Sequence, residues 1–179
     1  MLFRSTSVGT NADSSTFTTG ASTLFIGSAN TSGNSYFYGN LSNIRINTTA
    51  VYTGSFTPST TPLTAISGTQ FLSCQSNRFI DNSSNAFALT ATGTPSVQRF
   101  SPFNPTLPYS TTTIGGSGYF DGSGDYLSLA SNSNLAMGSG NFTVEYWLYP
   151  KSVSGASYVI DQQTSGSLIY YYDSKNSFY

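Results

Sequence analysis

The sequence contains no histidine and a single cysteine, Cys74. Without histidine, neither a Ser–His–Asp triad nor a histidine-ligated metal site can form within this chain. A lone cysteine makes no disulfide within the chain and cannot build a thiolate zinc site. Cys74 lies in the apolar stretch TQFLSCQ, which favours a buried side chain that packs as a small apolar group.

Charge is also scarce, because Asp, Glu, Lys and Arg together make up 7% of the residues. The six cations stand singly along the chain, whereas binding to nucleic acid or to an anionic membrane surface needs several basic residues together. No apolar run approaches the ~18 residues of a membrane-spanning helix. We therefore expect no nucleic-acid partner and no membrane insertion.

Glutamate occurs once, as Glu145. Glycoside hydrolysis normally needs two carboxyl groups on either side of the scissile bond, so Glu145 would have to be paired with one of the dispersed aspartates. We predict that the chain is not an enzyme. A polysaccharide hydrolase that uses Glu145 is the second alternative.

Aromatic residues are abundant at 15%, with thirteen Tyr and thirteen Phe, among many Ser, Thr, Asn and Gly. Aromatic and β-branched residues favour strands, and Gly, Asn and Ser favour the turns between them. The composition predicts an all-β protein built as an antiparallel β-sandwich or jelly roll. Strands are expected in residues 22–28, 34–47 with a bend or bulge at Gly39–Asn40, 69–74, 85–92, 118–122, 125–130, 141–150, 157–162 and 167–173.

Two proline-rich stretches interrupt these strands. Residues 58–68 are rich in Pro, Ser and Thr, which predicts a linker. Residues 100–113 contain three prolines, and we expect a second linker or a long surface loop there. Proline cannot donate a ladder hydrogen bond, so neither stretch is a central strand.

A specific pattern covers residues 116–150. It consists of Phe120-Asp121-Gly122, then Asp125-Tyr126-Leu127, a small polar spacer, and the strand Phe142-Thr143-Val144-Glu145-Tyr146-Trp147. This pattern resembles the opening of a concanavalin A-like jelly-roll module of the laminin-G type. The resemblance implies that residues 69–179 are the N-terminal half of such a module, with 100–113 as an internal loop. Residues 1–57 resemble the C-terminal strands of a preceding module, joined through the 58–68 linker.

The resemblance also has gaps. The family's middle strands usually carry a histidine-containing segment after a tryptophan, whereas this chain has only Trp147 and no histidine. Half a sandwich would leave open strand edges. We expect the two parts to pack together as a circularly permuted sandwich that lacks some middle strands. The alternative is an incomplete sandwich that neighbouring chains complete by strand addition.

Three groups of side chains are candidates for binding. Asp121 and Asp125 could hold Ca²⁺, although two carboxylates in a glycine-containing hairpin supply fewer oxygens than a tight site needs; the same residues also suit a turn. Tyr36, Tyr38 and Tyr171 could stack on sugar rings, or they could simply pack within strands. We expect no cofactor other than this candidate Ca²⁺.

The ending AVYTGSFTP at residues 50–58, the TPLTAI linker at 61–66 and the restart SCQSNRF at 73–79 are similar to tandem modules in structural or fibre proteins of tailed phages from aquatic bacteria. This resemblance implies a non-enzymatic module of a virion or extracellular surface that attaches to a host surface or to carbohydrate. The expected partners are other virion or fibre subunits, including copies of this chain, and cell-surface glycans. The first alternative is a purely structural subunit that assembles into a fibre or decorates a capsid.

Overall fold

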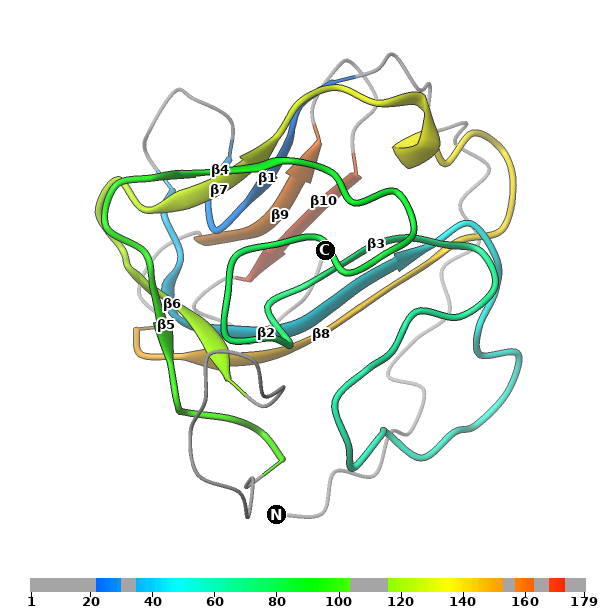
Figure 1. Ribbon diagram of the computed structural model, residues 1–179, viewed down its shortest axis with the longest axis horizontal. Coiled ribbons are helices and arrows are strands. Elements are labelled where there is room, and N and C mark those ends of the chain that lie inside the picture. The colour runs from blue at the N-terminus through cyan, green and yellow to red at the C-terminus, as the bar shows by residue number, and fades with distance from the viewer. Residues whose placement is uncertain (1–21, 30–34, 104–115, 153–156, 163–167, 173–179) are drawn as a thin grey trace.

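The computed structural model describes residues 22–29, 35–103, 116–152 and 157–162, and the backbone of 168–172. These residues form ten strands in two antiparallel sheets that face each other, as Figure 1 shows. The described part of the chain has no α-helix, only the short 3₁₀ helix η1 (Ser133–Leu135). It accordingly has no helix with the length and hydropathy that a membrane crossing requires. The predicted all-β class and the β-sandwich character are confirmed.

The first sheet has the strand order β10-β9-β1-β7-β4. In that order the strands are β10 (Leu168–Tyr172), β9 (Ser157–Gln162), β1 (Leu24–Ile26), β7 (Tyr126–Leu129) and β4 (Leu89–Thr92). All neighbouring strands are antiparallel.

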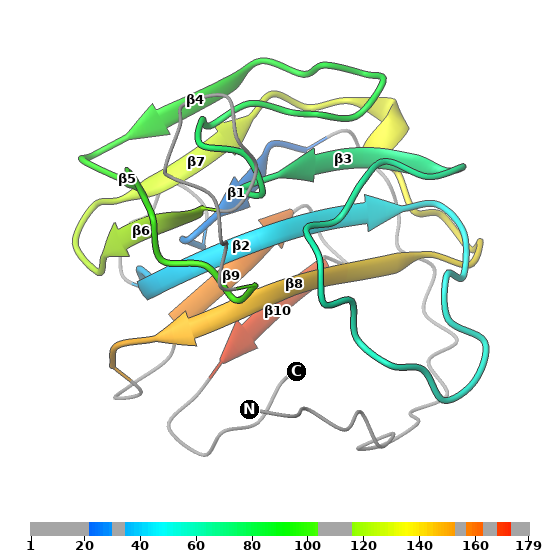
Figure 2. The same cartoon turned by 60° about the horizontal axis from the view of Figure 1, so that its bottom comes forward.

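The second sheet is built around the ten-residue strand β2 (Tyr38–Asn47). β8 (Thr143–Pro150) pairs along nearly the whole of β2. On the opposite edge, β6 (Ser117–Asp121) pairs with the beginning of β2, and β3 (Thr69–Ser73) pairs with its end. β5 (Ser96–Gln98) then pairs with β6. Figure 2 shows β2 between β8 on one side and β3 and β6 on the other.

The core lies between the two sheets because alternate side chains of each strand point inward. β2 contributes Leu41, Ile44 and Ile46, which are all at most 1% exposed. These side chains meet residues from both sheets and from η1, including Leu24, Ile26, Phe37, Phe71, Phe120, Leu127, Leu135, Val159 and Ile160. Cys74 is also buried, as the sequence predicts.

Strands from the two ends of the sequence share both sheets. β1 pairs with β7 and β9, and β2 pairs with β3, β6 and β8. Residues before 57 therefore pair with residues from 69 onward in the same chain, as expected for a single sandwich completed within one molecule. The assignment of these two parts to successive laminin-G-like modules stays a prediction.

The irregularity in β2 lies at Asn43, and the predicted bend or bulge at Gly39–Asn40 is wrong. Residues 39 and 40 pair regularly with both β6 and β8, whereas the register with β8 shifts between Ser42 and Arg45. Asn43 adopts a φ of 55°, a conformation that asparagine tolerates better than most residues. Its side-chain oxygen accepts a hydrogen bond from the Leu63 amide at 2.7 Å, and its amide nitrogen donates to Ser42 Oγ at 2.8 Å.

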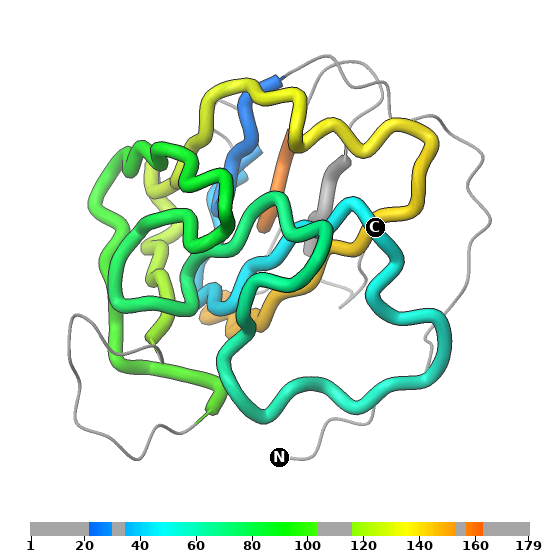
Figure 3. The backbone as a smooth tube through the Cα atoms, turned by 45° about the vertical axis from the view of Figure 1, so that its right-hand side comes forward, coloured from blue at the N-terminus to red at the C-terminus, as the bar shows by residue number. Residues whose placement is uncertain are grey.

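The stretch between β2 and β3 forms a wide loop beside the second sheet (Figure 3). Within the predicted linker 58–68, Leu63 is only 5% exposed, and the Thr64 carbonyl accepts a hydrogen bond from Arg45 Nη1 at 2.8 Å. This linker is thus packed against the sandwich. Of the proline-rich stretch 100–113, only 100–103 lies within the described residues.

Candidate functional site

The outer face of the second sheet carries a row of polar and aromatic side chains from β2. Because strand side chains alternate between faces, Leu41 points into the core while Tyr38, Asn40 and Ser42 point outward. The shift at Asn43 restores this alternation, so that Ile44 and Ile46 again point inward and Arg45 points outward.

β8 places two large aromatic rings beside that row. Trp147 lies opposite Ser42, and Tyr149 lies opposite Asn40. The side chains of β8 that point to the opposite face pack against the core; they are Val144, Tyr146 and Leu148. Tyr149 is 53% exposed, so its ring is available at the surface.

A groove with a volume of about 510 Å³ lies over this part of the sheet. Phe103 contacts Trp147 edge-on with 5.1 Å between ring centroids, and Phe100 contacts Tyr149 at 4.8 Å. Within the described part of the chain, the lining combines four aromatic rings with hydroxyl and amide groups and contains no Asp, Glu, Lys or Arg. It consists of Asn40, Ser42, Thr57, Pro58, Ser59, Thr60, Phe100, Pro102, Phe103, Ser117, Trp147, Leu148 and Tyr149.

Hydrogen bonds fix the polar side chains of the groove. Asn40 Nδ2 donates to Ser117 Oγ at 3.0 Å and to Gln98 Oε1 at 3.2 Å. Ser42 Oγ donates to the Gly116 carbonyl at 2.8 Å. These bonds hold neighbouring strands of the sheet in place and orient the groove's polar groups before any ligand arrives.

An ion pair between Arg45 and Glu145 anchors the loop that contains residues 57–60, through Tyr52 before them and Thr64 after them. Arg45 Nε and Nη2 both contact Glu145 Oε1, at 2.6 and 2.5 Å, and the two side chains are 6% and 13% exposed. The Tyr52 hydroxyl donates to Glu145 Oε2 at 2.6 Å. Burial and this hydrogen bond raise the pKa of Tyr52 to about 12. Tyr52 also stacks on Phe56 at 3.8 Å, which connects the ion pair to the residue just before 57–60.

Asp121 and Asp125 lie in the β6–β7 hairpin, where both accept hydrogen bonds from backbone amides. Asp125 is fully buried and accepts from the amides of Thr94 and Asp121, at 2.5 and 3.0 Å. Asp121 Oδ1 accepts from the Ser123 amide at 2.7 Å. Within the described residues, no group of three or more acidic, histidine or cysteine side chains could hold a metal ion.

Of the tyrosines chosen from the sequence, neither Tyr36 nor Tyr38 is among the residues that line the groove. Tyr38 is on the same outer face, next to Tyr119, and Tyr36 precedes β2 and is half-buried. For Tyr171 only the backbone is described, in β10, where it pairs with Tyr158.

The sequence prediction missed the four rings that do line the groove, Phe100, Phe103, Trp147 and Tyr149. The alternation along 141–150 places Trp147 and Tyr149 on one face, which is a usable signal. No sequence signal indicates that Phe100 and Phe103 meet these two rings, because 44 to 49 residues separate them along the chain.

No family model, curated protein or solved structure matches this chain. The geometry of the groove is therefore the basis for a functional proposal, since a sandwich fold hosts many unrelated functions.

Proposed function

We propose that this chain is a non-enzymatic adhesion module of a virion or surface appendage, and that it attaches to carbohydrate through the groove. The observation that carries the proposal is the pairing of exposed aromatic rings with fixed, uncharged hydrogen-bonding groups in one concave site.

Sugars fit this combination for a chemical reason. A sugar ring has apolar C–H faces that pack on aromatic rings, and hydroxyl groups around its edge that need hydrogen-bonding partners. The rings of Trp147 and Tyr149 supply apolar surface, and the hydroxyl of Tyr149 adds a polar group. Asn40, Ser42 and Ser117 supply amide and hydroxyl groups nearby.

The position of Glu145 supports a role without catalysis. Both of its carboxylate oxygens are engaged, one by Arg45 and the other by Tyr52. A general acid or nucleophile of a glycosidase must instead face the glycosidic bond, with a second carboxyl group on the other side of it. None of the described residues that line the groove is an aspartate or a glutamate.

The location on a virion or surface appendage rests on the likeness of residues 50–58, the linker 58–68 and residues 73–79 to tandem modules in structural or fibre proteins of phages. Modules of that kind would present the groove to a host surface while neighbouring subunits hold the module in place.

A glycan array with the full chain tests the proposal. We expect binding to at least one class of glycan, and a loss of about tenfold or more in affinity for Trp147→Ala and for Tyr149→Ala, which corresponds to about 1.4 kcal/mol. Tyr126→Ala is the matched control, because Tyr126 is a half-buried tyrosine in the other sheet. Its affinity should equal that of the unmodified chain.

Two results would overturn the proposal. One is the absence of any glycan binding by folded protein. The other is binding that survives both groove substitutions unchanged, since the ligand would then lie elsewhere on the molecule.

A further inference from the structure

A second aromatic surface adjoins the groove on the same face of the sheet. Tyr38 of β2 and Tyr119 of β6 contact each other edge-on, with 6.3 Å between ring centroids. The Lys151 ammonium lies 4.4 Å from the Tyr119 centroid and 6.0 Å from that of Tyr38. We call Tyr38, Tyr119 and Lys151 the tyrosine platform.

Strand register connects the platform to the groove. Asn40, in the groove, pairs with Tyr119 on one side and with Tyr149 on the other. Tyr119, Asn40 and Tyr149 therefore form one row across three adjacent strands. With neighbouring strands about 4.8 Å apart, the backbones of Tyr119 and Tyr149 are about 10 Å apart. Asn40 lies midway between the platform and the exposed ring of Tyr149.

The hairpin after β6 holds the platform in place. Gly122 has a φ of 81° and lies so close to Tyr38 that an added Cβ would be 2.9 Å from the Tyr38 Cβ. The ammonium of Lys151 further orders the two rings, because a cation is attracted to an aromatic face. Lys151 follows directly on β8, and its amide donates to the Tyr38 carbonyl at 2.9 Å.

Packing of the core does not account for this arrangement. Tyr38 and Tyr119 are half-buried and Lys151 is exposed, and all three lie on the face that points away from the other sheet. Two ordered aromatic rings at the surface, next to an aromatic groove, offer the same kind of apolar contact to a sugar that Trp147 and Tyr149 offer.

We infer that the tyrosine platform is a second subsite, and that the ligand is an oligosaccharide whose chain runs from the groove across Asn40 to Tyr38 and Tyr119. This inference rests on the proposed function. A single sugar ring is too short to touch both Tyr119 and Tyr149, whereas a chain of a few rings reaches both. Affinity therefore depends on chain length, because only the longer chains gain the contacts with the platform.

The test uses length series of the same glycan, from monosaccharide to hexasaccharide, for the cello-, chito-, malto-, mannan, galactan and uronan classes. For the class that binds, we expect the longest chain to bind at least about tenfold more tightly than the shortest one that binds. We call the affinity for the longest chain divided by that for the shortest chain the length ratio. In Tyr119→Ala the length ratio falls towards one, while the affinity for the shortest chain is unchanged. Tyr119→Leu, which keeps apolar volume but removes the flat ring, gives the same result and guards against a folding defect. Tyr126→Ala keeps the length dependence.

The outcomes separate the two proposals. If no glycan binds, the proposed function fails, and the subsite fails with it. If glycans bind in a way that depends on Trp147 but the length ratio is near one, the groove is confirmed and the subsite is wrong. A length ratio that is large but unchanged in both Tyr119 variants also overturns the subsite.

Discussion

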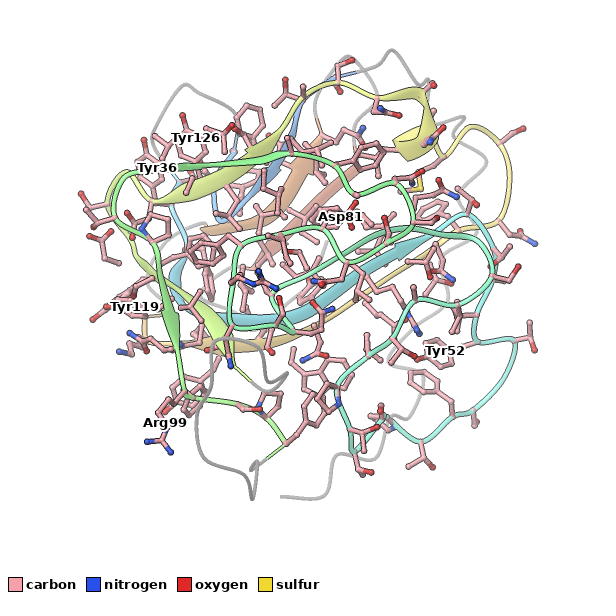
Figure 4. The ribbon with its side chains drawn as sticks, viewed as in Figure 1. Tyr36, Tyr52, Asp81, Arg99, Tyr119 and Tyr126 are labelled. Carbon is pink, nitrogen blue, oxygen red and sulfur yellow. The ribbon has the colours of Figure 1, made fainter. Side chains whose placement is uncertain are left out.

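At the scale of single residues, buried polar side chains hold the irregular segments of this protein. Asp81 is 7% exposed, and its two oxygens accept four hydrogen bonds: from the amides of Leu72, Ser83 and Phe87 and from Ser83 Oγ, at 2.8–3.0 Å. Figure 4 shows Asp81 near the centre of the view, where the chain after β3 folds back. One carboxylate thus fixes the route of the chain from β3 towards β4.

We expect Asp81→Ala to lower the free energy of unfolding by about 3 kcal/mol or more, because several buried donors lose their acceptor at once. Asp121→Ala is the matched control. Asp121 is exposed and, among the described residues, its side chain accepts only from the Ser123 amide, so its loss should cost about 1 kcal/mol or less. Urea unfolding followed by fluorescence measures both. Equal losses in the two variants would contradict this role of Asp81.

At the scale of elements, β2 organises the second sheet because both of its edges are paired. Gly39 is critical to that arrangement. A Cβ at this position would collide with the Tyr149 carbonyl oxygen and come within 2.9 Å of the Pro150 Cα. The absence of a side chain therefore allows β8 to lie against β2 where the groove begins.

We expect Gly39→Ala to destabilise the fold by about 3 kcal/mol or more, since rigid backbone atoms of β8 would have to move. Gly124→Ala is the control, because Gly124 has a φ of 78° but nothing within 4 Å of an added Cβ. Backbone strain alone should cost about 1 kcal/mol there. Thermal unfolding compares the two, and a Gly39→Ala protein as stable as Gly124→Ala would refute the close approach.

Strand existence was predictable from the sequence, but strand limits and pairing were less so. The alternation of Tyr and Phe with polar residues predicts β2 and β8. The strand expected at 85–92 is shorter, as β4 (Leu89–Thr92), because residues 81–87 are used by the hydrogen bonds to Asp81. β5 was not predicted, since three residues after a proline carry too little pattern. Its position depends on pairing with β6.

At the scale of the whole molecule, the groove combines distant parts of the chain. Its floor comes from β2 and β6, its rings from β8 and residues 100–103, and its wall from residues 57–60. Figure 4 places Tyr52 and Tyr119 at opposite ends of β2, so the tyrosine platform and the ion pair that anchors the loop containing this wall flank the groove. The groove therefore keeps its shape only while the second sheet of the sandwich is folded.

Global stability should fall in alkaline solution. Burial raises the pKa of Cys74 from 9.0 to about 12, and burial with the hydrogen bond to Glu145 raises that of Tyr52 from 10.0 to about 12. The folded protein holds both protons more tightly than the unfolded chain does. Their contribution is thus complete below pH 9 and is lost as the pH rises towards 12.

Urea unfolding between pH 7 and pH 11 measures this effect. We expect the decline above pH 9 to be shallower in Cys74→Ala, and the decline above pH 10 to be shallower in Tyr52→Phe, than in the unmodified chain. Identical slopes in all three proteins would show that neither group contributes.

The sequence by itself determined the class of fold, because alternating aromatic residues, turn-forming residues and scarce charge suit only a sheet protein. It also determined the absence of histidine chemistry and of disulfides within the chain. Tertiary structure alone decided that strands before residue 57 complete the sheets formed from residue 69 onward, and that four aromatic rings from separate segments line one groove. The physical reason is that alternation fixes which face a side chain occupies, whereas strand pairing over long separations fixes which side chains become neighbours.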